Sequence, residues 1–142
     1  MSYVDTNVIV AYVDELDPNH SKAVALLSSE GEKLTSKLTL VELTSVYSRA
    51  EFDEPLSLAM YSLKLAGVKL VEADFDRALV RSLELAPILR LRTLDLLHLA
   101  LCEVLRIKRF ATFDREIAAR SDVIRRKLGI EVVSEAGFPQ TC

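Results

Sequence analysis

Short strand-like runs alternate with helix-forming segments along the chain, and this alternation is the feature that most restricts its fold. Five runs of four to six residues have the composition of strands, and segments with apolar residues at helical spacing separate them. These runs are residues 2–5, 33–36, 68–73, 108–113 and 130–134. Helices between consecutive strands exclude hairpins and favour a parallel sheet covered by helices on both faces. The sequence therefore predicts a three-layer α/β/α fold with a central, short parallel β-sheet.

Seven helices are expected around these strands. Their approximate ranges are 6–16, 19–31, 39–50, 54–67, 74–89, 93–106 and 114–129. Pro55 and Gly67 mark the start and the end of the fourth helix, and Gly129 is the expected C-cap of the last. Pro87 is expected to break or kink the helix over 74–89, because proline lacks an N–H group and crowds the preceding turn.

Length and composition predict one globular domain spanning residues 1–142, with a loose tail from about residue 135. No apolar run approaches the roughly 18 residues that a membrane span needs. The N-terminus, "MSYVDTNVIV", has no basic n-region, so no secretory signal is expected. Cys102 and Cys142 form neither a metal-ligand spacing nor a disulfide framework. Together these observations predict a reduced, cytoplasmic protein.

The net charge of −3 does not suggest a nucleic-acid-binding protein, but the charge is unevenly spread. Residues 1–89 carry 8 basic and 14 acidic side chains, whereas residues 90–127 carry 10 basic and 5 acidic ones. A basic segment can attract phosphates locally even in an acidic protein. Solvated arginines on helix surfaces explain the same distribution, so charge alone does not decide between the two.

Four acidic residues lie at the junctions between strands and helices. Asp5 ends the first strand in "YVDTN", and Asp114 directly follows the fourth strand in "ATFDRE". Glu42, in "TLVEL", lies in the first turn of the helix after the second strand. Asp95, in "TLDLLH", lies in the first turn of a helix that is apolar on nearly every face. Because ligands of parallel sheets bind outside the carboxyl ends of the strands, these acids are candidates for one site.

Helix capping is the alternative explanation for each acid. Glu42 has the capping-box spacing to Thr39, Asp114 is a natural N-cap, Asp95 lies at the N-terminal end of a helix dipole, and Asp5 fits a turn. Capping explains why each acid is near a helix start. It does not explain why apolar sequence precedes Asp5 and Asp114, which indicates that these acids face a crevice rather than bulk water.

Convergence of the four acids would restrict their chemistry. Carboxylates within about 4–6 Å of one another repel, and a bound cation offsets that repulsion. Oxygen ligands suit Mg²⁺ or Mn²⁺, whereas zinc prefers histidine and cysteine. Such a site polarises a phosphodiester and supplies a metal-bound hydroxide, with a second ion at the leaving oxygen if two are present.

The same residues resemble a known family. The acids in "VDTNV", "LTLVEL", "TLDLLHLA" and "FATFD" resemble, in order and spacing, those of the PIN domain found in the toxins of VapBC-type toxin–antitoxin pairs. The resemblance runs from Tyr3 to about Val133. "DTN" alone is a weak signal, but the four acids in their own flanking patterns are a strong one.

This resemblance implies a metal-dependent endoribonuclease that hydrolyses RNA phosphodiester bonds with Mg²⁺ or Mn²⁺. Asp5, Asp95 and Asp114 match the metal-binding acids, and Glu42 completes the quartet as a ligand or water-orienting base. Hydroxyl and amide residues that support the acids are matched by Asn7, Ser36 and Thr112. A further acid sometimes found after the "TFD" position has no counterpart except Glu116, so one or two metal ions remain open. The family also implies a homodimer and an inhibitory antitoxin.

Two histidines and three arginines lie near these motifs. His98 follows Asp95 by one helical turn and could touch a metal or phosphate, but a partly buried histidine hydrogen-bonded to a neighbour is the favoured interpretation. His20 is interpreted as a helix-start residue near the surface. Possible contacts to RNA phosphates are Arg90, Arg92 and Arg115, and salt pairs or solvated surface are the alternatives.

Two other functions fit parts of the sequence. Phosphotransfer enzymes of the haloacid-dehalogenase type and response-regulator receivers also carry an acid after the first strand. The former needs an aspartate where this chain has Asn7, and both need a lysine near a later strand end, which "FATFD" does not offer. A non-catalytic PIN-like scaffold that binds RNA or a protein partner is the remaining alternative, and the complete set of four acids argues against it.

Overall fold

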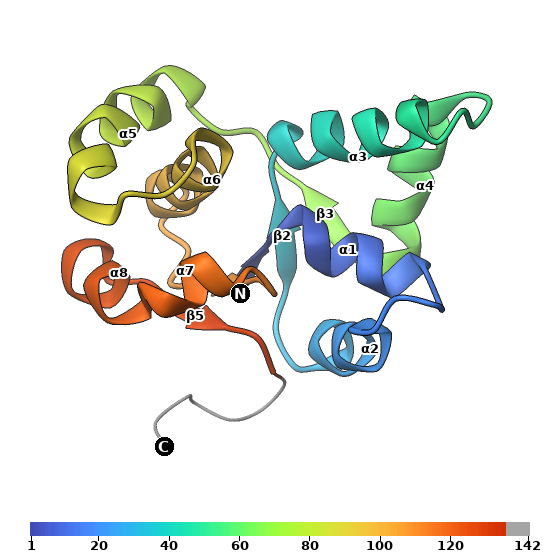
Figure 1. Ribbon diagram of the computed structural model, residues 1–142, viewed down its shortest axis with the longest axis horizontal. Coiled ribbons are helices and arrows are strands. Elements are labelled where there is room, and N and C mark those ends of the chain that lie inside the picture. The colour runs from blue at the N-terminus through green and yellow to red at the C-terminus, as the bar shows by residue number, and fades with distance from the viewer. Residues whose placement is uncertain (136–142) are drawn as a thin grey trace.

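A parallel sheet forms the centre of the computed structural model, which describes residues 1–135 (Figure 1). Its strands are β1 (Ser2–Val4), β2 (Lys33–Thr35), β3 (Val68–Leu70), β4 (Arg109–Ala111) and β5 (Glu131–Val133). The strand order is β3-β2-β1-β4-β5, and every neighbouring pair is parallel. The predicted α/β class and the five predicted strands are confirmed.

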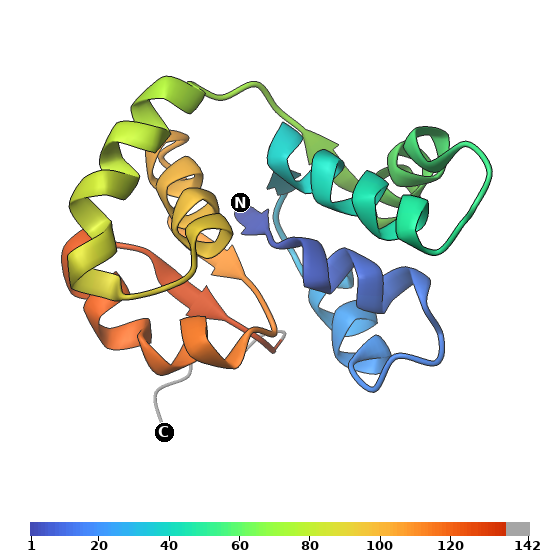
Figure 2. The same ribbon diagram turned by 45° about the horizontal axis from the view of Figure 1, so that its top comes forward.

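Eight helices among the described residues cover the two faces of the sheet. They are α1 (Thr6–Val13), α2 (His20–Ser28), α3 (Lys37–Arg49), α4 (Pro55–Ala66), α5 (Phe75–Leu89), α6 (Thr93–Val104), α7 (Arg115–Ala119) and α8 (Ser121–Leu128). Figures 1 and 2 show α1 to α4 grouped on one side of the molecule and α5 to α8 on the other. This arrangement is the predicted three-layer α/β/α fold.

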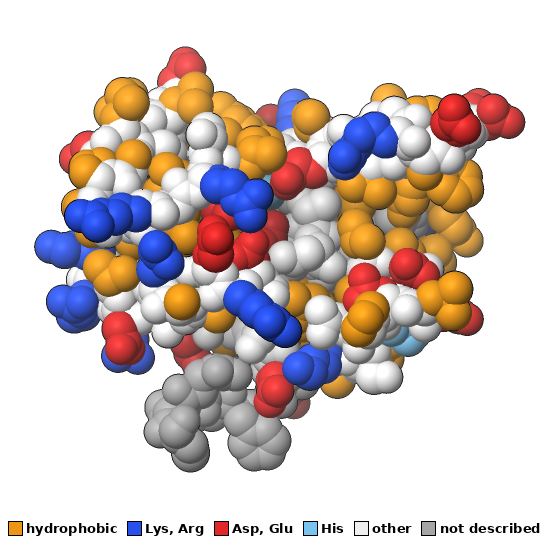
Figure 3. Space-filling model, in the orientation of Figure 1, with side chains coloured by type: hydrophobic (Ala, Val, Ile, Leu, Met, Phe, Trp, Pro, Cys, Tyr) orange, Lys and Arg blue, Asp and Glu red, His pale blue; other side chains and the backbone are white. Residues whose placement is uncertain are grey.

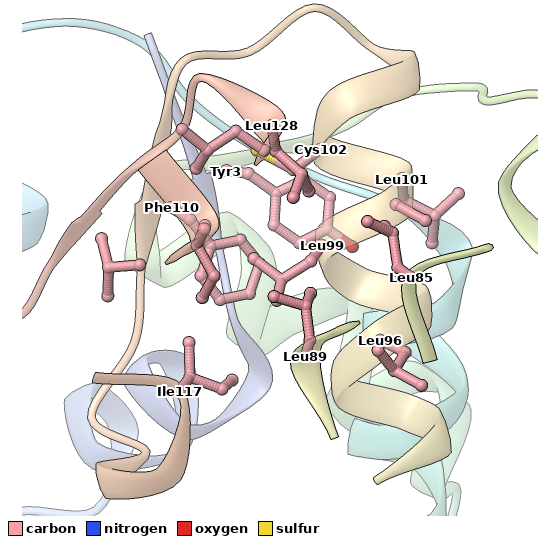
Figure 4. Close-up of a cluster of buried hydrophobic side chains, with 14 of the residues drawn as sticks. Tyr3, Leu85, Leu89, Leu96, Leu99, Leu101, Cys102, Phe110, Ile117 and Leu128 are labelled. Carbon is pink, nitrogen blue, oxygen red and sulfur yellow. The ribbon is translucent and has the colours of Figure 1, made fainter. Parts of the chain in front are cut away.

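Each face of the sheet has its own apolar core because neighbouring strand residues point in opposite directions. Tyr3 and Phe110 point toward the layer of α5 to α8, where they stack on one another with ring centroids 5.4 Å apart. Figure 4 shows this cluster, with leucines of α5 and α6 packed around the two rings. Val4 and Ala111 point the other way, into the core formed with α1 to α4. Packing against helices on both faces of the sheet thus holds the strand ends in place.

The helix boundaries differ from the sequence prediction at two places. The expected helix over 114–129 is two helices, α7 and α8, with Arg120 between them at φ −106° and ψ 16°. Pro87 does not break α5, which continues to Leu89 before Arg90 adopts a left-handed conformation. The predicted loose tail lies outside the described residues, apart from its first residue. Within residues 1–135, no helix has the length and apolarity that crossing a membrane requires.

The order of the strands determines where the candidate acids lie. β1 is central, with β2 on one side and β4 on the other, so the carboxyl ends of these strands adjoin. Asp5 continues the pairing past β1, because its N–H donates to the carbonyl of Ala111 in β4 at 2.9 Å. The residues after β1, β2 and β4 therefore meet where the carboxyl ends of these strands adjoin, next to the start of α6.

Candidate metal centre

A pocket of about 600 Å³ opens beside the carboxyl ends of the central strands. Its lining residues are Glu42, Leu91, Arg92, Thr93, Leu94, Asp95 and Asp114. Acidic side chains gather near the middle of this face in Figure 3, with Lys and Arg side chains beside them. Two groups of possible metal ligands lie here, and in each group the ligand atoms are within 4.8 Å of one another. We call Asp5, Glu42 and His98 the inner cluster, and Asp95, Asp114 and Glu116 the outer cluster.

Asp5 is held rigidly at the bottom of the site. It is the N-cap of α1, where its Oδ1 accepts a hydrogen bond from the N–H of Thr6 at 2.8 Å. Its Oδ2 accepts one from the hydroxyl of Thr112 at 2.7 Å. Only 5% of the residue is exposed. Burial raises the pKa of Asp5, although His98 and the hydrogen bond from Thr112 act in the opposite direction.

Glu42 reaches the site from the second turn of α3. The predicted first-turn position is wrong, because α3 begins at Lys37 behind Ser36 and not at Thr39. The capping box with Thr39 is absent for the same reason. Glu42 instead accepts hydrogen bonds at Oε1 from Thr6 Oγ1, at 2.7 Å, and from the His98 ring. Burial raises the pKa of Glu42, but the hydrogen bond and positive charge of His98 outweigh burial and lower it overall.

His98 is the buried residue that joins the inner cluster together. Its Nε2 donates to Glu42 Oε1 and lies 3.7 Å from Asp5 Oδ1. Its Nδ1 is 2.8 Å from the hydroxyl of Tyr3. Burial acts to lower the pKa of His98, but the hydrogen bond to Glu42 and the nearby carboxylates raise it overall. The predicted hydrogen bond to a neighbour is therefore confirmed, but His98 is fully buried rather than partly buried, and the sequence did not indicate contact with two acids.

The outer cluster is more exposed and contains only acids. Asp114 is the N-cap of α7, and its Oδ1 accepts hydrogen bonds from the N–H groups of Glu116 and Ile117 at 2.8 and 3.1 Å. Asp95 lies in the first turn of α6 with its carboxylate half-buried. Burial, and then the charges of Asp114 and Asp5, raise the pKa of Asp95 to about 6. Asp95 therefore interacts electrostatically with Asp5 of the inner cluster as well as with Asp114.

Thr112 and Asn7 connect the two clusters. The Thr112 hydroxyl, besides donating to Asp5, accepts from Asn7 Nδ2 at 3.2 Å and from the N–H of Asp114 at 3.0 Å. Asn7 Oδ1 also accepts from the N–H of Phe113 at 3.2 Å. One buried hydroxyl thus fixes the relative positions of two acids that are more than a hundred residues apart in the chain.

The third supporting residue acts through a different partner. Ser36 Oγ is 2.8 Å from the hydroxyl of Tyr3, which in turn contacts His98. Ser36 and Tyr3 are both fully buried. The structure therefore connects Ser36 to the carboxylate of Glu42 through three hydrogen bonds, by way of Tyr3 and His98.

The three candidate arginines differ in their relation to the outer cluster. Arg92 lines the pocket, and its Nε is 4.0 Å from Glu116 Oε2 while most of the side chain remains exposed. Arg90 follows α5 and Arg115 begins α7, and both are exposed. Of the three, Arg92 is the one that lines the pocket.

The donor atoms of this site fit a divalent cation. Acids from three separate segments line the pocket, Asp5 lies next to one of them, and the charges of Asp114 and Asp5 contribute to the raised pKa of Asp95. A cation relieves that repulsion and takes up carboxylate lone pairs that the hydrogen bonds leave free. Every buried side-chain nitrogen and oxygen among the described residues has a hydrogen-bond partner. The buried polar groups that hold the acids in place are therefore already hydrogen-bonded.

Comparison with known proteins gives one family and one fold. The sequence profile of the PIN domain family matches residues 2–123. No curated protein matches the chain. The fold is similar to VapC20 of Mycobacterium tuberculosis, a toxin that cleaves the sarcin–ricin loop (20% identity, TM-score 0.66, 84% of this chain and 94% of that one). It is also similar to a toxin–antitoxin complex from Klebsiella pneumoniae (15% identity, TM-score 0.65, 97% and 100%). A third similar structure is VapBC-1 of nontypeable Haemophilus influenzae (15% identity, TM-score 0.62, 94% and 98%).

Proposed function

This chain belongs to the PIN domain family, and from that premise we propose that it is a metal-dependent endoribonuclease, the toxin of a toxin–antitoxin pair. The observation that carries the proposal is the convergence of four acids: Glu42, Asp95 and Asp114 line one pocket, and buried Asp5 lies next to Glu42. These acids come from four distant segments, and helix capping explains the positions of Asp5 and Asp114 only in part. Structures with the same fold include a toxin that cleaves RNA and two toxin–antitoxin complexes, which supports this function.

We propose that Asp5, Asp95 and Asp114 hold the cation, Mg²⁺ or Mn²⁺. When bound, the cation would neutralise part of their charge and polarise the phosphodiester of the substrate. Asp5 supplies a fixed carboxylate because Thr6 and Thr112 hold both of its oxygens. Asp114 supplies Oδ2, since its Oδ1 caps α7.

Glu42 orients the attacking water. Its lowered pKa keeps it ionised, so it can accept a hydrogen bond from water but is a weak base. Thr6 and His98 hold its Oε1, which directs the other oxygen toward the pocket that Glu42 lines. Arg92, with Arg90 and Arg115 beside it, binds substrate phosphates and positions the RNA without reading its sequence.

An antitoxin protein and a second copy of this chain are the partners that we propose. Apolar side chains exposed on two regions support protein partners, because patches of this kind mark interaction surfaces. One region comprises Val41, Leu56 and Met60 on α3 and α4, and the other Leu79, Val80 and Leu83 on α5. The proposed compartment is the cytoplasm, where RNA and a co-expressed antitoxin are available.

Cleavage of RNA by the purified protein tests this proposal. The protein is incubated with end-labelled transfer RNA and ribosomal RNA fragments, with Mg²⁺ or Mn²⁺ and then with EDTA. We expect products that depend on the cation and disappear in Asp95→Asn, while Asp53→Asn, an exposed acid outside the site, cleaves normally. Binding of RNA with no cation-dependent product would instead favour the non-catalytic scaffold.

A further inference from the structure

An imidazole points into the carboxylates of the proposed metal centre. His98 is 1% exposed and lies one turn after Asp95 on α6. Its Nε2 contacts Glu42 Oε1 and is 3.7 Å from Asp5 Oδ1, so it faces both acids of the inner cluster. The function proposed above uses this ring only to hold Glu42. A buried histidine among carboxylates is a common cation ligand, so the geometry around Nε2 decides what the ring can do.

The spacing of the donors fits a shared cation. Two donors of one six-coordinate cation stand about 3.0 Å apart when adjacent and about 4.2 Å apart when opposite, for bonds of about 2.1 Å. The 3.7 Å between His98 Nε2 and Asp5 Oδ1 is about 0.7 Å longer than the adjacent spacing, so the two atoms must approach slightly to bind one cation in adjacent positions. Glu42 is less constrained, since about a quarter of its side chain is exposed, and it can turn toward the pocket when Nε2 takes another partner.

The second ring nitrogen of His98, Nδ1, has the kind of hydrogen-bond partner that is typical of a metal-binding histidine. Such histidines donate their other N–H to a fixed acceptor, which sets the ring orientation. Nδ1 of His98 is 2.8 Å from the Tyr3 hydroxyl, and that hydroxyl is 2.8 Å from Ser36 Oγ. Tyr3 can therefore accept from Nδ1 and donate to Ser36. The rings of Tyr3 and His98 also pack edge to face at 5.7 Å, which fixes the direction of Nε2.

We propose that His98 Nε2 is a direct ligand of the cation, together with Asp5, and that this nitrogen makes the site prefer Mn²⁺ over Mg²⁺. The cation takes the place of the Nε2 hydrogen, which leaves as a proton, while Nδ1 keeps its hydrogen for Tyr3. This inference rests on the proposed function only in requiring a divalent cation at the site. Mg²⁺ favours oxygen ligands and retained waters, whereas imidazole nitrogen strengthens the binding of transition metals.

The chain contains two histidines, which makes the nitrogen ligand assignable by spectroscopy. His20 lies on α2, where its Nδ1 donates to the carbonyl of Ala11 at 2.9 Å, and it does not belong to either cluster. The experiment is pulsed electron paramagnetic resonance of Mn²⁺ bound to the full chain, made without a histidine tag. A directly bound imidazole nitrogen modulates the Mn²⁺ echo, whereas oxygen ligands do not.

We expect this nitrogen modulation in the parent protein and in His20→Gln, and its loss in His98→Gln. If His98→Gln does not fold, the His20→Gln protein still decides, because His98 is then the one histidine left in the chain. Bound Mn²⁺ without nitrogen modulation in the parent would overturn the proposal, as would loss of the modulation in His20→Gln. A further check is affinity, since the Mn²⁺-over-Mg²⁺ ratio of binding constants should fall by about 10-fold in His98→Gln and be retained in His20→Gln.

The outcome is separable from that of the nuclease proposal. Nitrogen modulation in a protein that does not cleave RNA would support the His98 ligand and contradict the nuclease. Cation-dependent cleavage by a protein whose Mn²⁺ shows no nitrogen coupling would keep the nuclease and make His98 a positioning residue for Glu42.

Discussion

Asp5 and Asp114 follow neighbouring strands and both cap a helix, yet they leave different parts of their carboxylates available. Both oxygens of Asp5 accept hydrogen bonds, from Thr6 and from Thr112. Asp114 accepts both of its hydrogen bonds at Oδ1, and no described residue donates to its Oδ2. The inner cluster is thus more deeply buried and joined by hydrogen bonds, whereas the outer cluster is more exposed and has unused lone pairs.

This difference suggests a division of labour within one site. Fixed carboxylates lose little conformational entropy when a cation binds, so the inner cluster provides a preorganised position. The outer acids repel one another until a cation arrives, so they supply charge rather than rigidity. Substitutions in the two clusters should therefore affect cleavage and stability differently.

The largest expected effect is on cleavage, and it should be shared by both clusters. Asp5→Asn and Asp95→Asn each remove a charged ligand, and we expect RNA cleavage to fall by about 100-fold or more. The measurement is single-turnover cleavage with Mg²⁺ or Mn²⁺ at saturating protein, with Asp53→Asn as the control. If either variant cleaved as fast as the parent protein, its cluster would have no part in the reaction.

The second prediction concerns Thr112, which joins the clusters. Thr112→Val keeps the shape but leaves buried partners of its hydroxyl unpaired, so the unfolding free energy should fall by about 2 kcal/mol. Cleavage should fall by about 10-fold or more at a temperature where the protein stays folded, because both Asp5 and Asp114 lose their support. Chemical denaturation and cleavage assays measure the two effects.

Thr44→Val is the matched control for Thr112→Val. The Thr44 hydroxyl donates to the Leu40 carbonyl within α3, away from both clusters. This control should retain cleavage. Equal loss of cleavage in the two variants would contradict a specific connecting role for Thr112.

The third prediction separates the clusters by stability. In cation-free protein at pH 7, Asp95→Asn should raise the unfolding free energy by about 1 kcal/mol, because it removes repulsion at a half-buried position. Asp5→Asn should not, because both Asp5 oxygens accept hydrogen bonds, whereas an amide has one acceptor oxygen and would turn its NH₂ toward a donor, either Thr6 N–H or the Thr112 hydroxyl. Thermal unfolding in EDTA compares the two variants with the parent protein.

The raised pKa of Asp95 fixes the pH dependence of that gain. The pKa of Asp95 is about 6 in the folded protein and its ordinary value is 3.8. Between pH 3.8 and pH 6 the folded state therefore binds more protons than the unfolded state, and the protein loses stability as the pH rises. The advantage of Asp95→Asn should therefore be absent below about pH 4 and complete above about pH 7. A gain that shrinks with rising pH would have the wrong sign and would contradict the assigned repulsion.

The smallest expected effect is on RNA binding, from a substitution of Arg92 at the pocket. Arg92 is mostly exposed and its contact with Glu116 is long, so Arg92→Gln should leave stability unchanged. RNA binding should weaken by a few-fold, and the slope of log affinity against log salt should decrease by about 1. Arg126→Gln, on the exposed side of α8, is the control, and an equal change in both variants would remove Arg92 from the substrate path.

Much of the fold follows from local sequence patterns. Each strand is a short run between helical segments, and parallel pairing follows because helices connect consecutive strands. The N-cap at Asp114 is also readable locally, since its side chain bonds within its own helix. The break at Arg120 is not, because no glycine or proline marks it and the chain bends there to pack α8 against β5.

The site depends more on tertiary structure. Its four acids could be selected because each follows an apolar segment at a junction. The place of Glu42 was missed by one helical turn, because α3 begins two residues before the apparent capping box. The contacts of His98 with Asp5 and Glu42 join residues 56 and more positions apart, and no local pattern encodes them. The position of His98 one turn after Asp95 was the available signal.

Anomalous diffraction from a crystal grown with Mn²⁺ tests most directly whether the four acids form one cation-binding centre. We expect a Mn²⁺ peak in the pocket lined by Glu42, Asp95 and Asp114, within bonding distance of carboxylate oxygens from both Asp5 and Asp95. Cation-loaded crystals in which Mn²⁺ lies away from these carboxylates, or in which this pocket holds no peak, would contradict that assignment.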